Sequence, residues 1–181
     1  MRLRFVLALL VSIVATAAQL SAQDLAPRAY VVTPVHWNAV TISWGFYDGG
    51  LDFNDVVPIG NARGTYYVPV FSYYHSLRFF GRSANFTGAL PYGVGNFRGT
   101  VSGQFASIYR SGLLDSSFRF SVNLLGGPAM QPKEFAGWKQ RRLLGVSLKV
   151  IAPTGQYSGT KLVNWGSNRW AFKPELGYSE R

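Results

Sequence analysis

Five side chains in the second half of the chain have the types and spacing to form a polar interior. Arg119, Asn123, Lys149, Lys173 and Glu175 lie in segments that alternate polar and apolar residues. In an extended strand, residues two apart point to the same face, so each of these falls on a polar face. Because an unpaired buried charge is costly, such groups either pair within a filled interior or line a wet path that selects solutes by charge. We expect the filled network, since narrow closed sheets are often packed with side chains.

Enzymatic chemistry has few candidate residues. The chain has no cysteine, and its two histidines, His36 and His75, fall in separate segments. No Gly-x-Ser-x-Gly elbow occurs. Residues 93–98 begin like a dinucleotide motif but carry Arg98 where the third glycine should stand. We therefore expect a protein that is not an enzyme, with no catalytic residue, no cofactor and no metal site.

The segment from Ser117 to Leu124 sets the pattern for the rest of the chain. Phe118 and Phe120 fall on an apolar side, and Arg119 and Ser121 fall on a polar side. A period of two favours a strand over a helix. Strands of about this length are expected at residues 39–47, 65–75, 82–90, 99–109, 117–124, 141–152 and 170–178. Their length matches a tilted strand that crosses a bilayer, so the predicted fold is all-β, an antiparallel transmembrane barrel with about seven strands present.

The N-terminus has the features of a secretory signal. Arg2 and Arg4 precede an apolar stretch at residues 5–18, and Ala18 and Ala22 offer small residues for cleavage. The apolar stretch is short for a membrane anchor. We expect a signal peptide at residues 1–22 and a single β-barrel domain at residues 23–181.

The composition fits an exported membrane protein. Aromatic residues make up 15% and charged residues 14%, whereas soluble domains carry about a quarter charged residues. The net charge is +10, and removal of Arg2 and Arg4 leaves 16 basic against 8 acidic residues. Export argues against nucleic acid as the partner of this basic excess. We expect outer-membrane lipid and small solutes as partners.

The connections alternate in length, as they do in outer-membrane barrels. Short reversals are expected at residues 76–81 and 111–115 on one side of the sheet, and longer connections at residues 48–64, 91–98 and 126–139 on the other. The connection at residues 153–167 falls on the short side although it is long.

Several short motifs together resemble one known family. They are Phe80-Gly81-Arg82-Ser83-Ala84, Leu90-Pro91-Tyr92, Arg110-Ser111-Gly112-Leu113-Leu114-Asp115 with Arg119, Ser121-Val122-Asn123-Leu124, Gly127-Pro128-Ala129-Met130, Glu134-Phe135, Pro153-Thr154-Gly155-Gln156-Tyr157 and Asn168-Arg169-Trp170-Ala171-Phe172-Lys173-Pro174-Glu175-Leu176-Gly177. Their combination resembles the family labelled MetA-pathway of phenol degradation. The resemblance implies a β-barrel in the outer membrane of a Gram-negative-type bacterium, acting as a transporter or channel for small aromatic or hydrophobic compounds.

The C-terminus departs from that family, whose members continue with further strands. This chain ends at Ser179-Glu180-Arg181, and bacterial outer-membrane barrels have an even strand number. We therefore expect a C-terminally truncated chain and an incomplete barrel, whose seven strands could close only with one parallel seam. Two other functions stay open: a structural or surface protein with a plugged lumen, and a periplasmic lipocalin-like binder with its apolar face inward.

The orientation of the 117–124 strand gives a first test. Phe120→Arg would put a charge on the lipid face and should cost about 2–4 kcal/mol near the bilayer midplane. Ser121→Arg, on the polar face, should cost less. Folding free energies in lipid vesicles measure both, and equal losses would contradict the predicted orientation.

Overall fold

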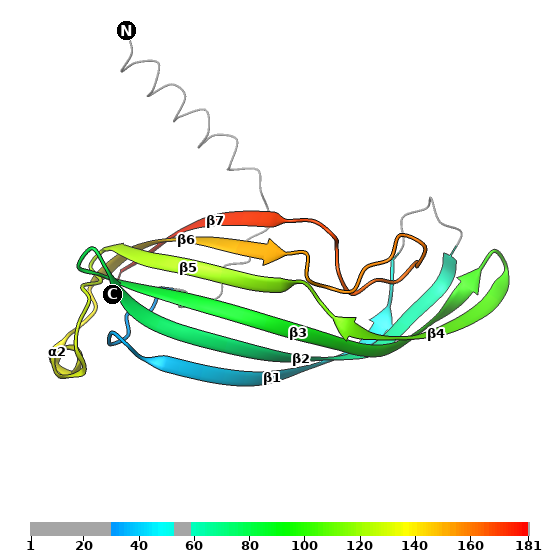
Figure 1. The fold of residues 1–181 in the computed structure, drawn as a ribbon, viewed down its shortest axis with the longest axis horizontal. Helices are drawn as coiled ribbons and strands as arrows, with labels where there is room; N and C mark the ends of the chain where they lie inside the picture. Colours follow the sequence, from blue (N-terminus) through cyan, green and yellow to red (C-terminus); the bar gives the residue numbers. More distant parts are fainter. Residues whose placement is uncertain (1–29, 53–58, 181) are drawn as a thin grey trace, which may run out of the picture.

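The fold is all-β, with one antiparallel sheet and a single short helix in the part of the chain described here (Figure 1). The computed structural model describes residues 30–52 and 59–180, so the predicted signal peptide lies outside the described residues. The strands are β1 (Asn38–Gly50), β2 (Ile59–Phe79), β3 (Arg82–Val101), β4 (Gln104–Leu113), β5 (Ser116–Leu125), β6 (Arg142–Ala152) and β7 (Ala171–Glu180), and the helix is α2 (Pro132–Gly137).

The seven strands occupy six positions across the sheet. The order is β1-β2-β3-β5-β6-β7, and β4 also pairs with β3. The long strand β3 pairs with β5 through residues 84–89 and with β4 through residues 92–101, so β4 and β5 lie end to end along one edge of β3. The sheet is not closed. Because six is an even number of positions, β1 and β7 run in opposite directions. Closure of this sheet would therefore not need the parallel strand pair expected from seven strands.

A β-bulge joins β4 to β5, where the sequence predicted a tight turn at residues 111–115. The Leu114 amide donates to the Pro91 carbonyl at 3.0 Å, and Ser117 then pairs with Ala89. Three residue steps from Leu114 to Ser117 therefore oppose two steps from Pro91 to Ala89. One extra residue on one strand is the definition of a bulge, and it shifts which side chains share a face. The predicted turn is wrong because the chain continues in the same direction.

The turn that reverses the chain lies between β3 and β4, at Ser102 and Gly103. Their φ angles are 49° and 83°. Two central residues with positive φ suit a two-residue hairpin, whose twist matches that of the flanking strands.

Residues 91–98, predicted as a loop from their glycines and proline, are part of β3. A Cβ atom on Gly93 would lie 2.5 Å from the Trp165 ring, and one on Gly95 would lie 2.3 Å from the Tyr66 Cβ. These glycines leave room for aromatic side chains that pack closely on the strand. The prediction is wrong because it assigned the glycines to chain reversal.

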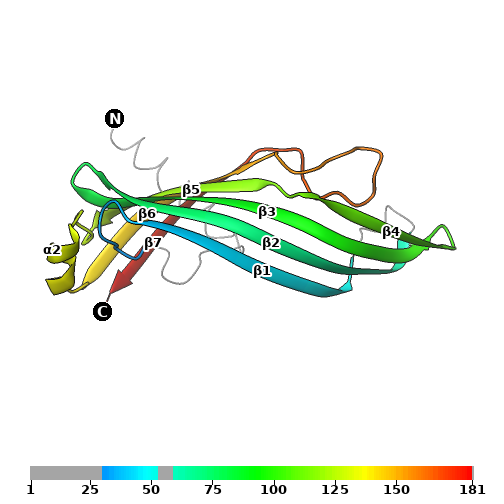
Figure 2. The same cartoon turned by 60° about the horizontal axis from the view of Figure 1, so that its bottom comes forward.

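The two faces of the sheet differ sharply. Large apolar and aromatic side chains project from one face, called the outer face, and stay exposed; they include Val40, Ile42, Trp44, Phe71, Leu90, Leu148, Phe172 and Leu176. Small polar side chains on the opposite, inner face are buried: Ser76, Ser83, Asn85, Ser121, Asn123 and Ser147. The sheet is strongly twisted, with β6 and β7 running at a steep angle to β1–β3 (Figure 2). No helix within residues 30–52 and 59–180 is long and apolar enough to cross a membrane.

Burial changes the expectation for Ser121. Its side chain is 1% exposed, and its Oγ donates to Asn85 Oδ1 at 2.7 Å. An arginine would have no room there, so Ser121→Arg should cost at least as much as Phe120→Arg. Thr41, exposed on the inner face of β1, is the better site for a comparison.

The connections are not sorted by length as predicted. The β2–β3 turn and the long connection that carries α2 lie at the same end of the sheet (Figure 1). The Ser83 amide donates to the Gly127 carbonyl at 2.9 Å, and the Ala129 amide donates to the Gly81 carbonyl at 3.1 Å. Residues 153–170 extend from the opposite end (Figure 1). The missed bulge caused the error, because every later connection was assigned to the wrong end.

Glycine substitutions test whether close packing explains the misread segment. Gly93→Ala should cost about 1–3 kcal/mol of unfolding free energy, because the added methyl group overlaps the Trp165 ring. Gly88→Ala on the same strand should stay within about 0.5 kcal/mol, since its Cβ would lie 3.5 Å from Phe118. Urea unfolding in lipid vesicles measures both variants. Equal losses of unfolding free energy would mean that the Trp165 contact is not the reason why position 93 requires glycine.

Candidate functional site

The register places all five predicted site residues on the inner face. One row across the strands contains Asn85, Ser121, Ser147 and Glu175, and the next contains Thr87, Arg119, Lys149 and Lys173. Asn123 lies on the same face, opposite Gly145. Residues from β3, β5, β6 and β7 are thereby brought together over a span of about 90 residues in the sequence, as strand pairing allows.

Arg119 and Glu175 form an ion pair that Ser147 joins. Arg119 Nη2 lies 3.0 Å from Glu175 Oε2, and Arg119 Nε donates to Ser147 Oγ at 3.1 Å. The Ser147 hydroxyl donates to Glu175 Oε2 at 2.7 Å. The two charged side chains are only 20% and 14% exposed, so the pair is largely removed from solvent. In such surroundings each charge depends on the other, and loss of one partner is more damaging than at an open surface.

Three basic side chains are aligned in the row next to this pair. Arg119, Lys149 and Lys173 are directly opposite one another across three strands, and Glu175 is the one carboxylate among these four predicted residues. Lys149 and Lys173 each take part in a further interaction besides this alignment.

Asn123 is placed apart from the charged network. Its side chain is buried, and its Oδ1 has no hydrogen-bond partner among the described residues. A Cβ atom on Gly127 would lie 2.4 Å from the Asn123 Cβ, so the connection after β5 packs directly against it. We therefore assign Asn123 to the packing of this end of the sheet.

Residues 30–37, called the strap, cross the inner face from β6 to β2. The Tyr30 hydroxyl lies 3.2 Å from Ser147 Oγ, and the Tyr30 ring lies 5.3 Å from the Arg119 guanidinium carbon. Further along the strap, Thr33 Oγ1 lies 2.7 Å from the Tyr74 hydroxyl. A Cβ atom on Gly145 would lie 2.3 Å from the Tyr30 ring, so glycine is needed there. The alternation of polar and apolar residues in the sequence did not predict that the strap crosses the inner face.

A small apolar core holds the strap. Val32 is 1% exposed and packs with Met130 and Leu143, against which Phe135 and Trp138 also lie. The Val35 amide donates to the Met130 carbonyl at 2.9 Å. The connection between β5 and β6 therefore fastens the strap across one end of the inner face.

Asp115 fastens residues 153–170 at the other end. Its carboxylate accepts hydrogen bonds from the Gly155 amide at 2.9 Å and from the amide and hydroxyl of Ser167 at 2.7 and 2.6 Å. Burial disfavours its ionised form, but these hydrogen bonds outweigh burial and hold the pKa of Asp115 below its ordinary value. Trp165, from this loop, makes edge-on contacts with Tyr66 and Phe97 on the inner face.

Comparison with known proteins gives one family. The family model described as "Putative MetA-pathway of phenol degradation" matches residues 39–179. Neither curated proteins nor solved structures gave a match.

Removal of one charge tests the Arg119–Glu175 pair. Glu175→Gln should lower the unfolding free energy by about 1–3 kcal/mol, because Arg119 loses its counter-charge in a largely buried place. The matched control is Glu180→Gln on the same strand, where Glu180 and Arg142 are 49% and 66% exposed and solvent screens the pair, so its loss should change the unfolding free energy little. Urea unfolding measures both. A Glu175 variant as stable as the Glu180 variant would show that the pair is not a stabilising contact.

Proposed function

The chain belongs to this family, associated with phenol degradation, and from that premise we propose that it forms the wall of an outer-membrane channel for small aromatic or hydrophobic compounds. The proposal includes export through the predicted signal peptide, contact with outer-membrane lipid, no binding of nucleic acid and no enzymatic activity. It treats the described sheet as one side of the barrel domain predicted for residues 23–181.

The main support for the proposal is that apolar side chains lie on one face of the sheet and polar side chains on the other. Exposed side chains such as Ile42, Trp44 and Leu176 would cost free energy in water, whereas they would be favourable against lipid. The inner face carries the buried serine hydroxyls and the Arg119–Glu175 pair. An apolar exterior and a polar interior are the pattern of transmembrane barrels. The same pattern counts against a lipocalin-like binder, whose apolar face would be enclosed.

Aromatic side chains near the ends of the strands support a membrane position. On the outer face, Phe46 lies against Tyr67 with ring centroids 5.1 Å apart, and Trp170 stacks on Phe172 at 6.3 Å. Tyrosine and tryptophan have an apolar ring and a polar atom, and they gather where lipid headgroups meet water.

A second candidate is a structural or surface protein with a plugged lumen. The strap covers the Arg119–Glu175 pair, and Trp165 covers part of the inner face at the opposite end. If the strap and Trp165 both stay in these positions, little space is left for a solute to pass along the inner face. The two candidates therefore differ in whether the strap leaves the inner face.

Fractionation and conductance separate the three functions. We expect the full chain to fractionate with the outer membrane and to give small conductance steps in planar bilayers. Tyr30→Ala removes the contacts with Ser147 and Arg119, so its steps should be larger. Tyr178→Ala is the control, since Tyr178 is exposed on the outer face of the edge strand.

Two results would contradict the channel, and a third would contradict control of passage by the strap. A protein that is soluble without detergent would support the lipocalin-like binder. Absence of conductance in both the unmodified protein and the Tyr30 variant would support the plugged structural protein. Equal conductance changes from Tyr30→Ala and Tyr178→Ala would show that the strap does not control passage.

A further inference from the structure

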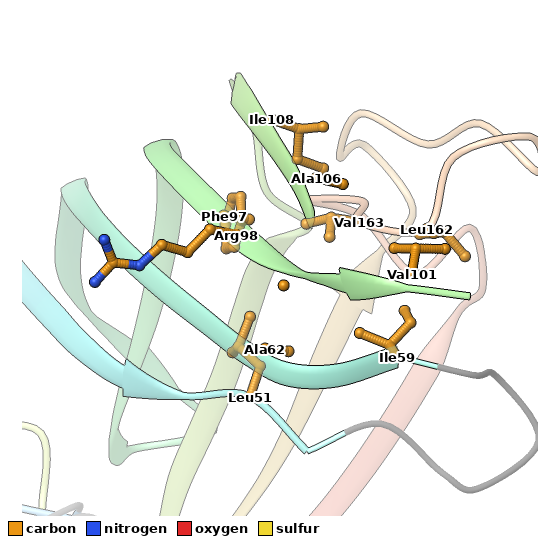
Figure 3. Close-up of a pocket in the computed structure, with 11 residues that line it drawn as sticks. Leu51, Ile59, Ala62, Phe97, Arg98, Val101, Ala106, Ile108, Leu162 and Val163 are labelled. Atoms are coloured by element: carbon orange, nitrogen blue, oxygen red, sulfur yellow. The ribbon is translucent and has the colours of Figure 1, made fainter. Parts of the chain in front are cut away.

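Two cavities adjoin at the end of the inner face that residues 153–170 cover. The first has an empty volume of about 450 Å³, a figure that includes space open to solvent. Its apolar walls include Leu51, Ile59, Phe97, Ile108, Leu162 and Val163 (Figure 3). The second, of about 200 Å³, is lined by Arg110, Lys161, Val163 and Trp165 among others. Val163 lines both, so the two cavities share a wall.

Two residues that line the second cavity, Arg110 and Trp165, each carry a buried donor without an acceptor. Arg110 Nε and Trp165 Nε1 are buried and have no hydrogen-bond partner in the part of the chain that the structure describes. Neither side chain has an acceptor atom, so they cannot satisfy each other. A buried donor without an acceptor costs free energy, and that cost is recovered when an acceptor binds.

The charge at this cavity is positive and uncompensated. Within residues 30–52 and 59–180, Arg110 forms no ion pair, and its Nη1 donates to the Tyr109 carbonyl at 3.2 Å. Lys161 adds a second cation at the rim. Guanidinium groups bind carboxylates with two parallel hydrogen bonds, which neutral acceptors do not match.

The apolar wall and the donors are held in a fixed relation by one strand. Ile108 and Arg110 are two residues apart on β4, so both side chains project from the same face. Ile108 pairs with Phe97 on β3, whose ring contacts Trp165 at a centroid distance of 5.6 Å. A ligand with a ring and an acidic group on it could therefore occupy both cavities at once.

We propose that the two cavities form one binding site for a small aromatic carboxylate. The ring lies against Phe97, Ile108 and Val163, and the carboxylate accepts hydrogen bonds from Arg110 and Trp165. The inference rests on the proposed channel in that it names the class of solute at one mouth of that channel, but binding itself requires only this end of the sheet.

Arg98 provides a matched control for Arg110. It belongs to the strand segment that borders the apolar cavity, but its guanidinium points away from the apolar side chains (Figure 3). Arg98→Gln and Arg110→Gln remove the same charge, and only the second removes a donor from the cavity. Arg110→Lys keeps the charge and replaces the forked guanidinium.

Calorimetric titration of the full chain in nanodiscs of zwitterionic lipid tests the site, with benzoate and benzyl alcohol as probes at neutral pH. We expect benzoate to bind at least about tenfold more tightly than benzyl alcohol, because an anionic acceptor forms stronger hydrogen bonds with buried donors than a neutral acceptor does. Arg110→Gln should remove that preference and leave benzyl alcohol affinity unchanged. Arg98→Gln should leave both affinities unchanged, and Arg110→Lys should keep part of the preference.

Equal affinity of the unmodified protein for the two probes would overturn the proposal, and this comparison needs no variant to fold. An equal loss from Arg98→Gln and Arg110→Gln would also overturn it, since the preference would then come from overall charge. The planar-bilayer result is independent of these outcomes. Benzoate preference without conductance would contradict the channel alone, whereas conductance without benzoate preference would contradict the carboxylate site alone.

Discussion

The Arg119–Glu175 ion pair, bridged by the Ser147 hydroxyl, is the contact on which the inner face depends. It links β5, β6 and β7, and the strap reaches the same hydroxyl through Tyr30. A charge so far removed from water is tolerated only when a partner lies beside it. The polar interior and the position of the strap are therefore consequences of one register between neighbouring strands.

Glycine residues in the strands allow aromatic side chains to pack closely on the inner face. Tyr30 packs over Gly145 and Trp165 packs over Gly93, in both cases closer than a side chain would allow. The two ends of the inner face are thus covered by different segments in the same manner. Each segment is also fastened at one end of the sheet, the strap by Met130 and residues 153–170 by Asp115.

Positive charge runs along the inner face. Arg119, Lys149 and Lys173 share one row, and Arg110 lies beyond the bulge on the same face, near the loop that Asp115 holds. The arrangement connects the proposed binding site with the proposed channel through a single electrostatic property, and it agrees with the basic balance of the whole chain.

The sequence by itself determined the all-β class, the family and the face on which Arg119, Lys149, Lys173 and Glu175 lie, because alternation with period two is a local property of each strand. It misplaced the β4–β5 junction, since a bulge leaves no mark in that pattern, and it assigned the glycines of β3 to a loop. Only the tertiary structure decided which rows meet, that the strap crosses the inner face, and that Arg110 and Trp165 share a cavity. These features arise from contacts between segments far apart in the chain, and strand periodicity carries no information about them.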